Sequence, residues 1–364
     1  MKRVLVAMSG GVDSSVAAYL LKKEGYEVIG ATIQTWSSNE CRDERAKGCC
    51  SIRDISDARS VAGKLDIPYY VLDLSSDFKE KVIDYFVETY LDAKTPNPCI
   101  ACNNHIKFGV FLKKAEELKA DFVATGHYAR RIWNEEERRW AIREAVDASK
   151  DQSYVLFGLN QQQIAKTLLP VGEYEKTEIR RIAESLGMRV FDKPDSQEIC
   201  FVKTHYADFL KEQGAALPGR GPIVDLDGVA VGEHEGYHLY TIGQRKRIGV
   251  TSADPFFVVA IDKETNTITI GGEQDLYVTR MTIEKMNWMK TPDIGHAYEV
   301  KIRSRNTKRL GRLISYDQET ALFEFDLPEK AVTPGQAGVL YDRGVIVGGG
   351  WIREACCVPT PAFS

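Results

Sequence analysis

An apolar segment, a glycine-rich loop and an amphipathic helix follow one another at the start of the chain. Residues 4–8 are apolar, residues 9–15 read SGGVDSS, and residues 14–24 carry apolar side chains at helical spacing until Gly25. A strand that leads through glycines into a helix brings backbone N–H groups and hydroxyls to one point, where they can bind an anion. The loop matches neither the Walker A pattern nor G-x-G-x-x-G. The sequence therefore predicts a phosphate site after the first strand of an α/β domain.

Strand-like and helix-like segments alternate through the first two hundred residues. The expected strands are 4–8, 26–33, 69–74 and 122–125, and the expected helices are 14–24, 54–65, 78–91 and 106–118. This order predicts a doubly wound parallel sheet, in which ligands bind at the carboxyl ends of the strands.

Strands without intervening helices are expected after about residue 203, where glycine and proline become frequent. Residues 256–262 and 267–271 are predicted to form a hairpin, and short strands continue from residue 281 to residue 352. We therefore expect three domains: an ATP-binding and catalytic α/β domain at 1–203, a small mixed domain at 204–281 and a C-terminal β-barrel-like domain at 282–364.

The composition is typical of a globular protein, with 43% hydrophobic and 27% charged residues among 364. No apolar run reaches the length of a membrane span, and the N-terminus does not resemble a signal peptide. We therefore expect a cytoplasmic protein without a membrane partner. In a reducing compartment, its eight cysteines are expected to be catalytic, metal-binding or buried. The net charge of −4 means that a nucleic-acid site has to be a local patch.

The loop at residues 9–15 resembles the PP-loop of the ATP pyrophosphatase superfamily, whose members cleave ATP between the α- and β-phosphates and adenylate a carbonyl oxygen. The resemblance implies an adenine nucleotide alpha hydrolase-like fold, ATP and Mg²⁺ as cofactors, and Asp13 as the carboxylate near Mg²⁺. A glycine-rich turn without a ligand is the alternative. The implied ATP-binding residues are Ala7, Met8, Ser9, Gly10, Gly11, Val12, Asp13, Ser14, Ser15, Ile33 and Gly126.

Two polar loops that contain prolines each present cysteine: TPNPCIACN at residues 95–103 and KPDSQEICF at residues 193–201. Together with TGHYAR (125–130), KDQSY (150–154) and YTIGQRKRIG (240–249), these loops resemble the bacterial tRNA-specific 2-thiouridylase family. The resemblance extends from residue 3 to about residue 352. It implies a sulfurtransferase that adenylates the C2 oxygen of the tRNA wobble uridine, U34, and replaces this oxygen with persulfide sulfur.

In that family the cysteine of the second loop, here Cys200, carries a persulfide whose outer sulfur attacks C2. The cysteine of the first loop, here Cys102, then attacks the persulfide or releases sulfide from it, and a Cys102–Cys200 disulfide bond remains. Thiolate is the reactive form in each step. Two buried cysteines without a catalytic role are the alternative.

Cys99 departs from the family pattern, since many members have aspartate at this position. Cys99, Cys102 and Cys200 could therefore hold a 4Fe–4S cluster with one open iron. The alternative, which we favour, is that Cys99 is a tolerated substitution at a position that contacts the base. No residue is assigned with certainty as a metal ligand.

Two further patterns resemble metal motifs, but we interpret neither as a metal site. Cys41, Cys49 and Cys50 lack a complete four-ligand zinc spacing, and we expect a surface loop near the active site. His234 to His238 satisfies H-E-x-x-H, but Gly232 and Gly236 argue against the helix that zinc ligation requires.

A basic run at residues 301–312, KIRSRNTKRLGR, has six basic residues and no acidic residue. We expect it to neutralise tRNA phosphates, and a solvated strand face is the alternative. Arg245, Lys246 and Arg247 form a smaller basic cluster. The target base has to leave the anticodon stack to reach ATP. By the family resemblance, the tRNA-binding residues are Asn97, Pro98, Cys99, His127, Lys150, Asp151, Gln152, Arg303, Ser304 and Gln336.

The expected partners are a tRNA with a wobble uridine, of the lysine, glutamate or glutamine type by the family resemblance, and a persulfide donor or relay protein. We expect a monomer. One alternative is a PP-loop ligase or amidotransferase that adenylates a small metabolite, which leaves Cys102 and Cys200 unexplained. Another is a non-catalytic RNA-binding or iron–sulfur protein, which leaves the SGGVDSS loop unexplained.

Overall fold

The computed structural model describes residues 1–35, 52–195, 199–202, 205–250 and 255–357. The chain divides into two compact units. The first comprises Met1–Asp84, Pro98–Lys203 and Arg343–Ile346, and the second comprises Tyr85–Asn97, Thr204–Asp342 and Val347–Ser364. None of the described helices is both long enough and apolar enough to span a bilayer.

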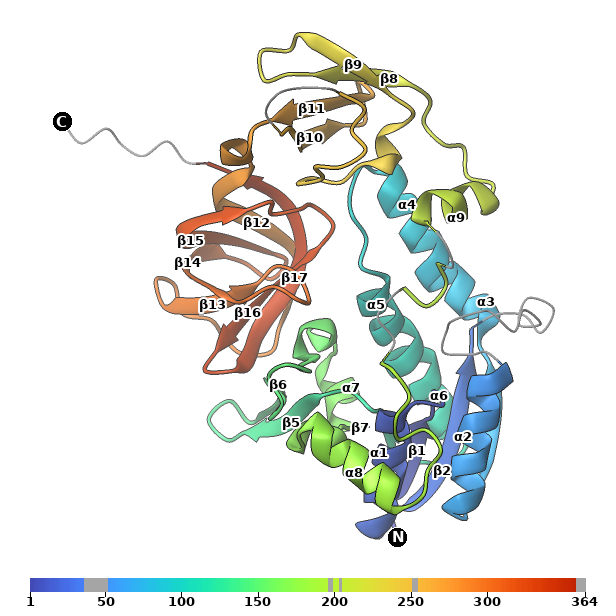
Figure 1. The fold of residues 1–364 in the computed structure, drawn as a ribbon. Helices are drawn as coiled ribbons and strands as arrows, with labels where there is room; N and C mark the ends of the chain where they lie inside the picture. The colour runs from blue at the N-terminus through green and yellow to red at the C-terminus, as the bar shows by residue number, and fades with distance from the viewer. Residues whose placement is uncertain (36–51, 196–198, 203–204, 251–254, 358–364) are drawn as a thin grey trace. The chain divides into compact units, whose positions relative to one another are not determined.

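A parallel sheet with the strand order β3-β2-β1-β4-β7 forms the centre of the first unit (Figure 1). Every neighbouring pair is parallel. The strands are β1 Arg3–Ala7, β2 Glu27–Gln34, β3 Tyr69–Asp73, β4 Phe122–Ala124 and β7 Thr167–Leu168. The chain leaves β1 toward β2 and returns later to β4 on the other side of β1, so the ends of β1 and β4 flank the switch point where such sheets bind ligands. The predicted doubly wound fold is confirmed.

Apolar side chains on both faces of the sheet are buried, because successive strand residues point to opposite sides. Val4 and Val6 of β1, and Met8 directly after it, share a core with residues of three helices. Leu5 faces the opposite side and is fully buried as well. The three helices are α1 Val12–Lys23, α2 Ile52–Lys64 and α8 Lys176–Ser185.

Two of the predicted helices begin earlier than expected and contain π-helical segments. The helix predicted at 78–91 consists of α3 Ser75–Phe78, the π-helical segment η1 Lys79–Ile83 and α4 Asp84–Leu91. The helix predicted at 106–118 consists of α5 Pro98–Ala101, the π-helical segment η2 Cys102–Val110 and α6 Phe111–Glu117. Segments of this kind frequently occur at functional sites, and η2 begins at Cys102.

Several elements of the first unit were not predicted from the sequence. They are the antiparallel pair β5 Ala129–Asn134 and β6 Arg139–Glu144, the 3-10 helices η3 Ser153–Leu156 and η4 Pro170–Glu173, and the helices α7 Gln161–Ala165 and α8. Helix α8 is the most important of them, because it carries a lysine of the candidate site.

The second unit contains the helix α9 Tyr206–Glu212 and a mixed sheet with the strand order β10-β11-β8-β9. Its strands are β8 Gly221–Val224, β9 Ala230–His234, β10 Phe257–Asp262 and β11 Thr267–Gly271. Strands β10 and β11 are antiparallel and confirm the predicted hairpin. Asn266 lies in its turn with φ +52°, a conformation that asparagine tolerates. His234 ends β9, and His238 lies in the 3-10 helix η5 Tyr237–Leu239, so the H-E-x-x-H segment is not one helix.

Strands β12 to β17 close into an antiparallel barrel with the order β12-β15-β14-β13-β16-β17, in which β12 also pairs with β17. The strands are β12 Tyr277–Trp288, β13 Ala297–Lys301, β14 Arg309–Tyr316, β15 Thr320–Lys330, β16 Ala337–Asp342 and β17 Val345–Cys356, preceded by the 3-10 helix η6 Glu273–Leu276. Tyr298, Leu313 and Phe323 are buried in its core. The predicted C-terminal β-barrel is therefore confirmed.

Replacement of Phe323 by alanine tests the barrel core. Phe323 is 0% exposed, whereas Leu327 on the same strand is 79% exposed. We expect Phe323→Ala to lower the free energy of unfolding by about 3–5 kcal/mol, because it leaves a cavity. Leu327→Ala is expected to change this free energy by less than about 0.5 kcal/mol. Denaturant unfolding of the full chain, followed by circular dichroism, measures both, and equal effects would contradict the assigned core.

Candidate active site

The loop between β1 and α1 has the geometry of an anion site. Gly11 is the N-cap residue of α1, and no side chain caps the helix. An uncapped helix N-terminus leaves backbone N–H groups available to an anion. The Ser9 and Ser14 hydroxyl oxygens lie 3.3 Å apart, and the Ser15 hydroxyl donates to the Gly11 carbonyl oxygen at 2.8 Å. The predicted phosphate-binding residues 9–15 thus form one continuous strand–loop–helix turn.

Two glycines allow the backbone to approach this loop closely. Gly10 has φ +73°, and a Cβ atom there would lie 2.3 Å from the Asp54 carbonyl oxygen. A Cβ atom at Gly126, which follows β4, would lie 2.6 Å from the Ser14 backbone nitrogen. Gly126 therefore borders the N-terminal turn of α1, as expected from its predicted place in the ATP site. Ala7 ends β1, and Ile33 lies near the end of the adjacent strand β2.

A buried lysine binds the carboxylate of Asp13. The Lys176 ammonium donates to both Asp13 carboxylate oxygens at 2.7 and 2.8 Å, and the Tyr128 hydroxyl donates to Oδ1 at 2.7 Å. Lys176 also forms an ion pair with Asp195 at 2.7 Å, and only 9% of its side chain is exposed. Burial and then the charge of Asp13 raise the pKa of Tyr128, so its phenol stays protonated as the donor. This cluster fixes the carboxylate that the sequence places near Mg²⁺.

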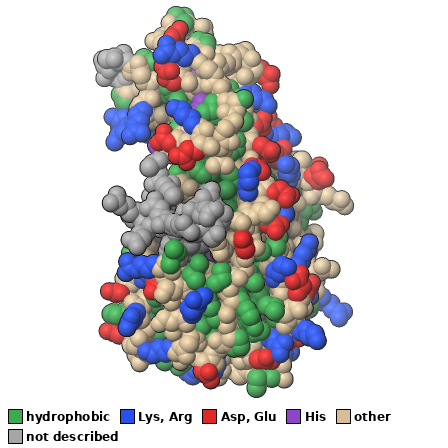
Figure 2. Space-filling model, turned by 90° about the vertical axis from the view of Figure 1, so that its right-hand side faces the viewer, with side chains coloured by type: hydrophobic (Ala, Val, Ile, Leu, Met, Phe, Trp, Pro, Cys, Tyr) green, Lys and Arg blue, Asp and Glu red, His purple; other side chains and the backbone are tan. Residues whose placement is uncertain are grey.

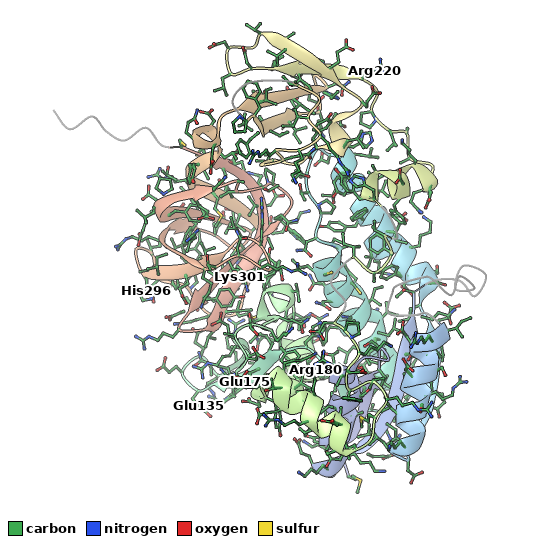
Figure 3. All side chains as sticks on the ribbon, in the orientation of Figure 1. Glu135, Glu175, Arg180, Arg220, His296 and Lys301 are labelled. Carbon is green, nitrogen blue, oxygen red and sulfur yellow. The ribbon has the colours of Figure 1, made fainter. Side chains whose placement is uncertain are left out.

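Asp195 connects the segment before Cys200 to the same cluster. Its second oxygen accepts from the Lys150 ammonium at 2.8 Å, and the Arg180 guanidinium lies 3.6 Å away. Burial raises the pKa of Asp195, but the hydrogen bonds from Lys150 and Lys176 outweigh this effect and lower it overall. Figure 3 shows Arg180 on α8, the helix that also carries Lys176.

Lys193 connects this segment to the phosphate loop a second time. Its ammonium donates to the Gly10 carbonyl oxygen at 2.9 Å and to carboxylate oxygens of Asp54 and Asp57 at 2.6 and 2.7 Å. Burial lowers the pKa of Lys193, but the two carboxylates outweigh this effect and raise it overall. The residues before Cys200 are therefore attached to the phosphate loop through both Lys193 and Asp195.

His127 is buried next to the end of β4. Its Nδ1 lies 2.7 Å from the Thr125 hydroxyl oxygen, and its Nε2 lies 3.5 Å from the Lys107 ammonium. Burial, followed by the charge of Lys107, holds the pKa of His127 well below its ordinary value. The ring is therefore neutral at physiological pH.

The predicted tRNA residues 150–152 lie in the same unit and have internal partners. Asp151 accepts from the Ala145 backbone N–H at 3.1 Å and from the Ser153 hydroxyl at 2.8 Å. Gln152 accepts from the Tyr128 backbone N–H at 2.9 Å. These bonds attach the 150–152 segment to the residue that contacts Asp13.

Cys102 lies beside a buried anchor. Cys99 is exposed on α5, and Cys102 is partly exposed at the start of η2. The next residue, Asn103, is 1% exposed, and its amide donates to the Val155 carbonyl oxygen at 3.1 Å. The anchor fixes the backbone that carries Cys102.

Cys200 is held in a similar way. It is partly exposed in a turn closed by the Val202 N–H, which donates to the Ile199 carbonyl oxygen at 3.1 Å. Phe201 packs edge-on against Phe78, with ring centroids 5.8 Å apart. Each predicted catalytic cysteine therefore lies next to a buried residue on a positioned segment.

The predicted Cys102–Cys200 disulfide bond is absent, and no disulfide joins cysteines in the described part of the chain. Both thiols are therefore in the reduced form. Across the same residues, no three His, Cys, Asp or Glu side chains are grouped as metal ligands. The arrangement of Cys99, Cys102 and Cys200 thus gives no support to the iron–sulfur alternative. Cys41, Cys49 and Cys50 lie outside the described residues.

In the second unit, Arg303 contacts a turn at residues 331–336, and Gln336 is the last residue of that turn. Arg303 donates to the Ala331 carbonyl oxygen and the Thr333 hydroxyl oxygen, each at 2.8 Å. Gln336 donates to the carbonyl oxygens of Thr95 and Pro96, each at 3.1 Å. Asn97 follows directly, so three predicted tRNA residues lie around this turn. Ser304 is exposed, and Pro98 belongs to the first unit.

Half of the basic residues in the 301–312 run form ion pairs with acidic residues. Lys308 pairs with Glu299 at 2.6 Å, Arg309 with Glu329 at 2.6 Å, and Arg312 with Asp326 at 3.9 Å. These pairs reduce the charge that the run can offer to phosphates. On the face drawn in Figure 2, basic and acidic side chains are likewise interspersed.

Several members of the site were not predicted from the sequence. Tyr128, Lys193 and Asp195 lie inside the motifs TGHYAR and KPDSQEICF, so their positions carried a signal that was not assigned to a contact. Lys176 lay outside every motif. Its only local signal is the Glu175–Glu178 capping box, which marks the beginning of a helix.

Comparison with known proteins identifies the family. Models of three domains match consecutive segments: the tRNA methyl transferase HUP domain over residues 2–204, the tRNA methyl transferase PRC-barrel domain over residues 207–272 and the Aminomethyltransferase beta-barrel domain over residues 278–352.

Curated relatives match almost the whole chain. The tRNA-specific 2-thiouridylase MnmA of Symbiobacterium thermophilum is 46% identical, over 97% of this chain and 93% of its own length. The proteins of the same name from Clostridioides difficile and Lachnoclostridium phytofermentans are 45% and 47% identical, each over 97% of this chain and 99% of its own length. At this identity and coverage, the chain belongs to the MnmA family of tRNA-specific 2-thiouridylases.

Proposed function

We propose that this protein uses ATP to replace the C2 oxygen of the tRNA wobble uridine, U34, with sulfur. The main support for the proposal is that the Cys200 segment is attached to the phosphate loop at two points. Lys193 contacts Gly10 of the loop directly. Asp195 pairs with Lys176, which also pairs with Asp13 of the loop. An adenylating loop and a sulfur carrier then serve one reaction. We assign adenylation to the domain at residues 1–203. Contacts with tRNA are assigned both to this domain and to the C-terminal domain at residues 282–364. Residues 204–281 form a small central domain in the order of the chain.

In the first step, the uridine C2 oxygen attacks the α-phosphorus of ATP, and pyrophosphate leaves. The N-terminus of α1 and the hydroxyls of Ser9 and Ser14 stabilise the charge that develops on the leaving group. Lys176 lies next to this loop and supports it through Asp13. A bound Mg²⁺ would neutralise phosphate charge, and an Asp13 oxygen suits it as one ligand beside phosphate and water oxygens.

In the second step, the outer sulfur of a Cys200 persulfide attacks C2, and AMP leaves with the former uridine oxygen. The Cys102 thiolate then attacks the inner sulfur, at Cys200. The bond between the two persulfide sulfurs breaks, and 2-thiouridine is released with a Cys102–Cys200 disulfide. A thiol reductant returns two electrons to the cysteines, and a persulfide donor reloads Cys200.

The proposed RNA partner is a tRNA of the lysine, glutamine or glutamate type, bound by a monomer. His127 is buried between Thr125 and Lys107, and its neutral ring adds no charge beside a flipped base. Asn97, Pro98 and Cys99 are proposed to line the base. The other proposed tRNA contacts are His127, Lys150, Asp151, Gln152, Arg303, Ser304 and Gln336.

Mass spectrometry of tRNA nucleosides tests this function. After incubation with the protein, ATP, Mg²⁺ and a persulfide donor, we expect 2-thiouridine at the wobble position, and none when ATP is omitted. Pyrophosphate release that depends on a small acid and not on tRNA would instead favour a metabolite ligase.

Cysteine variants separate the relay from a cluster. We expect Cys102→Ser and Cys200→Ser each to abolish 2-thiouridine formation, because each removes a sulfur that the relay needs. Cys99→Ser is expected to remain active. Adenylation, measured as pyrophosphate release in the presence of tRNA, should survive in all three variants, since the phosphate loop is unchanged. An inactive Cys99→Ser variant, together with a brown wild-type protein purified without oxygen, would contradict the relay.

Lys176→Met tests the support of the phosphate loop. The change leaves Asp13 and Asp195 without their shared cation, so we expect tRNA-dependent pyrophosphate release to fall at least about 100-fold. The matched control is Lys166→Met, because Lys166 pairs with Glu116 on the surface of the same unit. We expect this control to keep the wild-type rate. Both variants should bind tRNA as wild type, and full activity of a folded Lys176→Met protein would exclude the assigned role.

A further inference from the structure

Three consecutive basic residues lie on a turn between η5 and β10 in the second unit. Arg245, Lys246 and Arg247 are all exposed. None of them forms an ion pair within 4 Å with an acidic residue of the described ranges. The pKa of Glu273 is lowered mainly by Lys330 and, more weakly, by the charge of Arg245, but Glu273 is ion-paired with Lys330 at 2.6 Å. Among the described residues, no carboxylate therefore pairs with the positive charges of the turn.

The backbone of this turn is fixed before any ligand binds. The Gly243 N–H donates to the Val258 carbonyl oxygen at 2.8 Å, and the Val258 N–H donates to the Gln244 carbonyl oxygen at 3.0 Å. The Gln244 side chain donates to the Lys246 carbonyl oxygen at 3.0 Å. Ile248, which follows the basic residues, is 5% exposed and belongs to the core beside the β8–β11 sheet. A backbone that is already ordered loses less conformational entropy when a ligand binds.

Arg245 and Arg247 line the same pocket, which has a volume of about 290 Å³. The other described residues of its wall are Ile248, Gly249, Val250, Pro255 and Phe256. A guanidinium group binds phosphate through two parallel hydrogen bonds. An aromatic ring beside it offers a surface against which a ribose or an unstacked base can pack. The pocket thus combines the two kinds of contact by which proteins hold an RNA strand.

Several other arginines of the second unit differ from Arg245 and Arg247 because they are paired with carboxylates. Arg220, on the segment before β8, forms a two-bond ion pair with Glu235, at 2.7 and 3.1 Å. Arg309 and Arg312 of the basic run are also paired with carboxylates. Figure 3 marks Arg220 near β8. A phosphate that approaches these side chains has to displace a carboxylate, whereas at Arg245 and Arg247 it meets no such competitor among the described residues.

We propose that Arg245 and Arg247 form a binding site for phosphates of the tRNA backbone. That the bound polyanion is tRNA rests on the proposed function. That the turn binds an anion rests on its two exposed arginines and its fixed backbone. Contacts to phosphates position an RNA and do not read its sequence. The site therefore contributes equally to all tRNAs, whichever base occupies the wobble position.

Salt-dependent tRNA binding tests this site. The test variant is Arg245→Gln combined with Arg247→Gly, and the control is Arg220→Gln, which removes a neutralised arginine from the same unit. Glycine is chosen because Arg247 has φ +62°, which glycine adopts without strain, so the variant keeps its fold. Fluorescence anisotropy with a wobble-uridine tRNA and a wobble-cytidine tRNA measures the affinity between low and high salt. Thiolation at saturating tRNA is measured in parallel.

We expect the double variant to bind both tRNAs more weakly by the same factor. The slope of log affinity against log salt should become shallower by about one for each arginine. Arg220→Gln should keep the wild-type slope, and saturating tRNA should restore thiolation. If a folded double variant keeps the wild-type salt dependence of tRNA binding, the anion site is wrong. Thiolation by the wild-type protein would show in that case that the proposed function still stands. A wild type that binds tRNA but forms no 2-thiouridine would instead reject the proposed function.

Discussion

The buried ammonium of Lys176 joins parts of the candidate site that are far apart in sequence. It contacts Asp13, at the start of α1, and Asp195, five residues before Cys200. Two carboxylates so close together repel each other unless a cation lies between them. Removal of that cation would leave Asp13 without its ammonium partner, whereas Asp195 would keep its hydrogen bond from Lys150. The phosphate loop and the cysteine segment are therefore coupled through this side chain, in addition to the contact of Lys193 with Gly10.

Helix α8 brings Lys176 to this position. The Glu175–Glu178 capping box sets where the helix begins, and the Lys176 backbone N–H donates to an Asp147 carboxylate oxygen at 3.0 Å. Burial raises the pKa of Asp147, but hydrogen bonds from Ser149 and from Lys176 outweigh this effect and lower it overall. Asp147 stays ionised and continues to accept. A residue outside every sequence motif is thus positioned by ordinary helix capping and one buried carboxylate.

Local patterns predicted the elements that carry a clear apolar pattern or a turn signal. The buried strand at 4–8, the hairpin around Asn266 and the barrel follow from runs of apolar residues and from turn chemistry. The β5–β6 pair was missed because its strands are rich in arginine and partly exposed, so their pattern is not that of a buried strand. The motifs also indicated the segments to which we assign the chemistry. They could not show which side chains meet, since the Lys176–Asp13 contact spans 163 residues. The positive charge that the 301–312 run can offer to phosphates was overestimated as well. Glu299 of β13 and Glu329 of β15 form ion pairs with two of its basic residues.

The central claim is that the phosphate loop activates the C2 oxygen of uridine for replacement by a sulfur carried on the attached segment. Transfer of that oxygen to AMP tests the claim most directly. A substrate tRNA with heavy oxygen at C2 of the wobble uridine is incubated with the protein, ATP, Mg²⁺ and a persulfide donor, and the released AMP is analysed by mass spectrometry. The account predicts one labelled oxygen in AMP for each 2-thiouridine formed. Formation of 2-thiouridine with unlabelled AMP would contradict it.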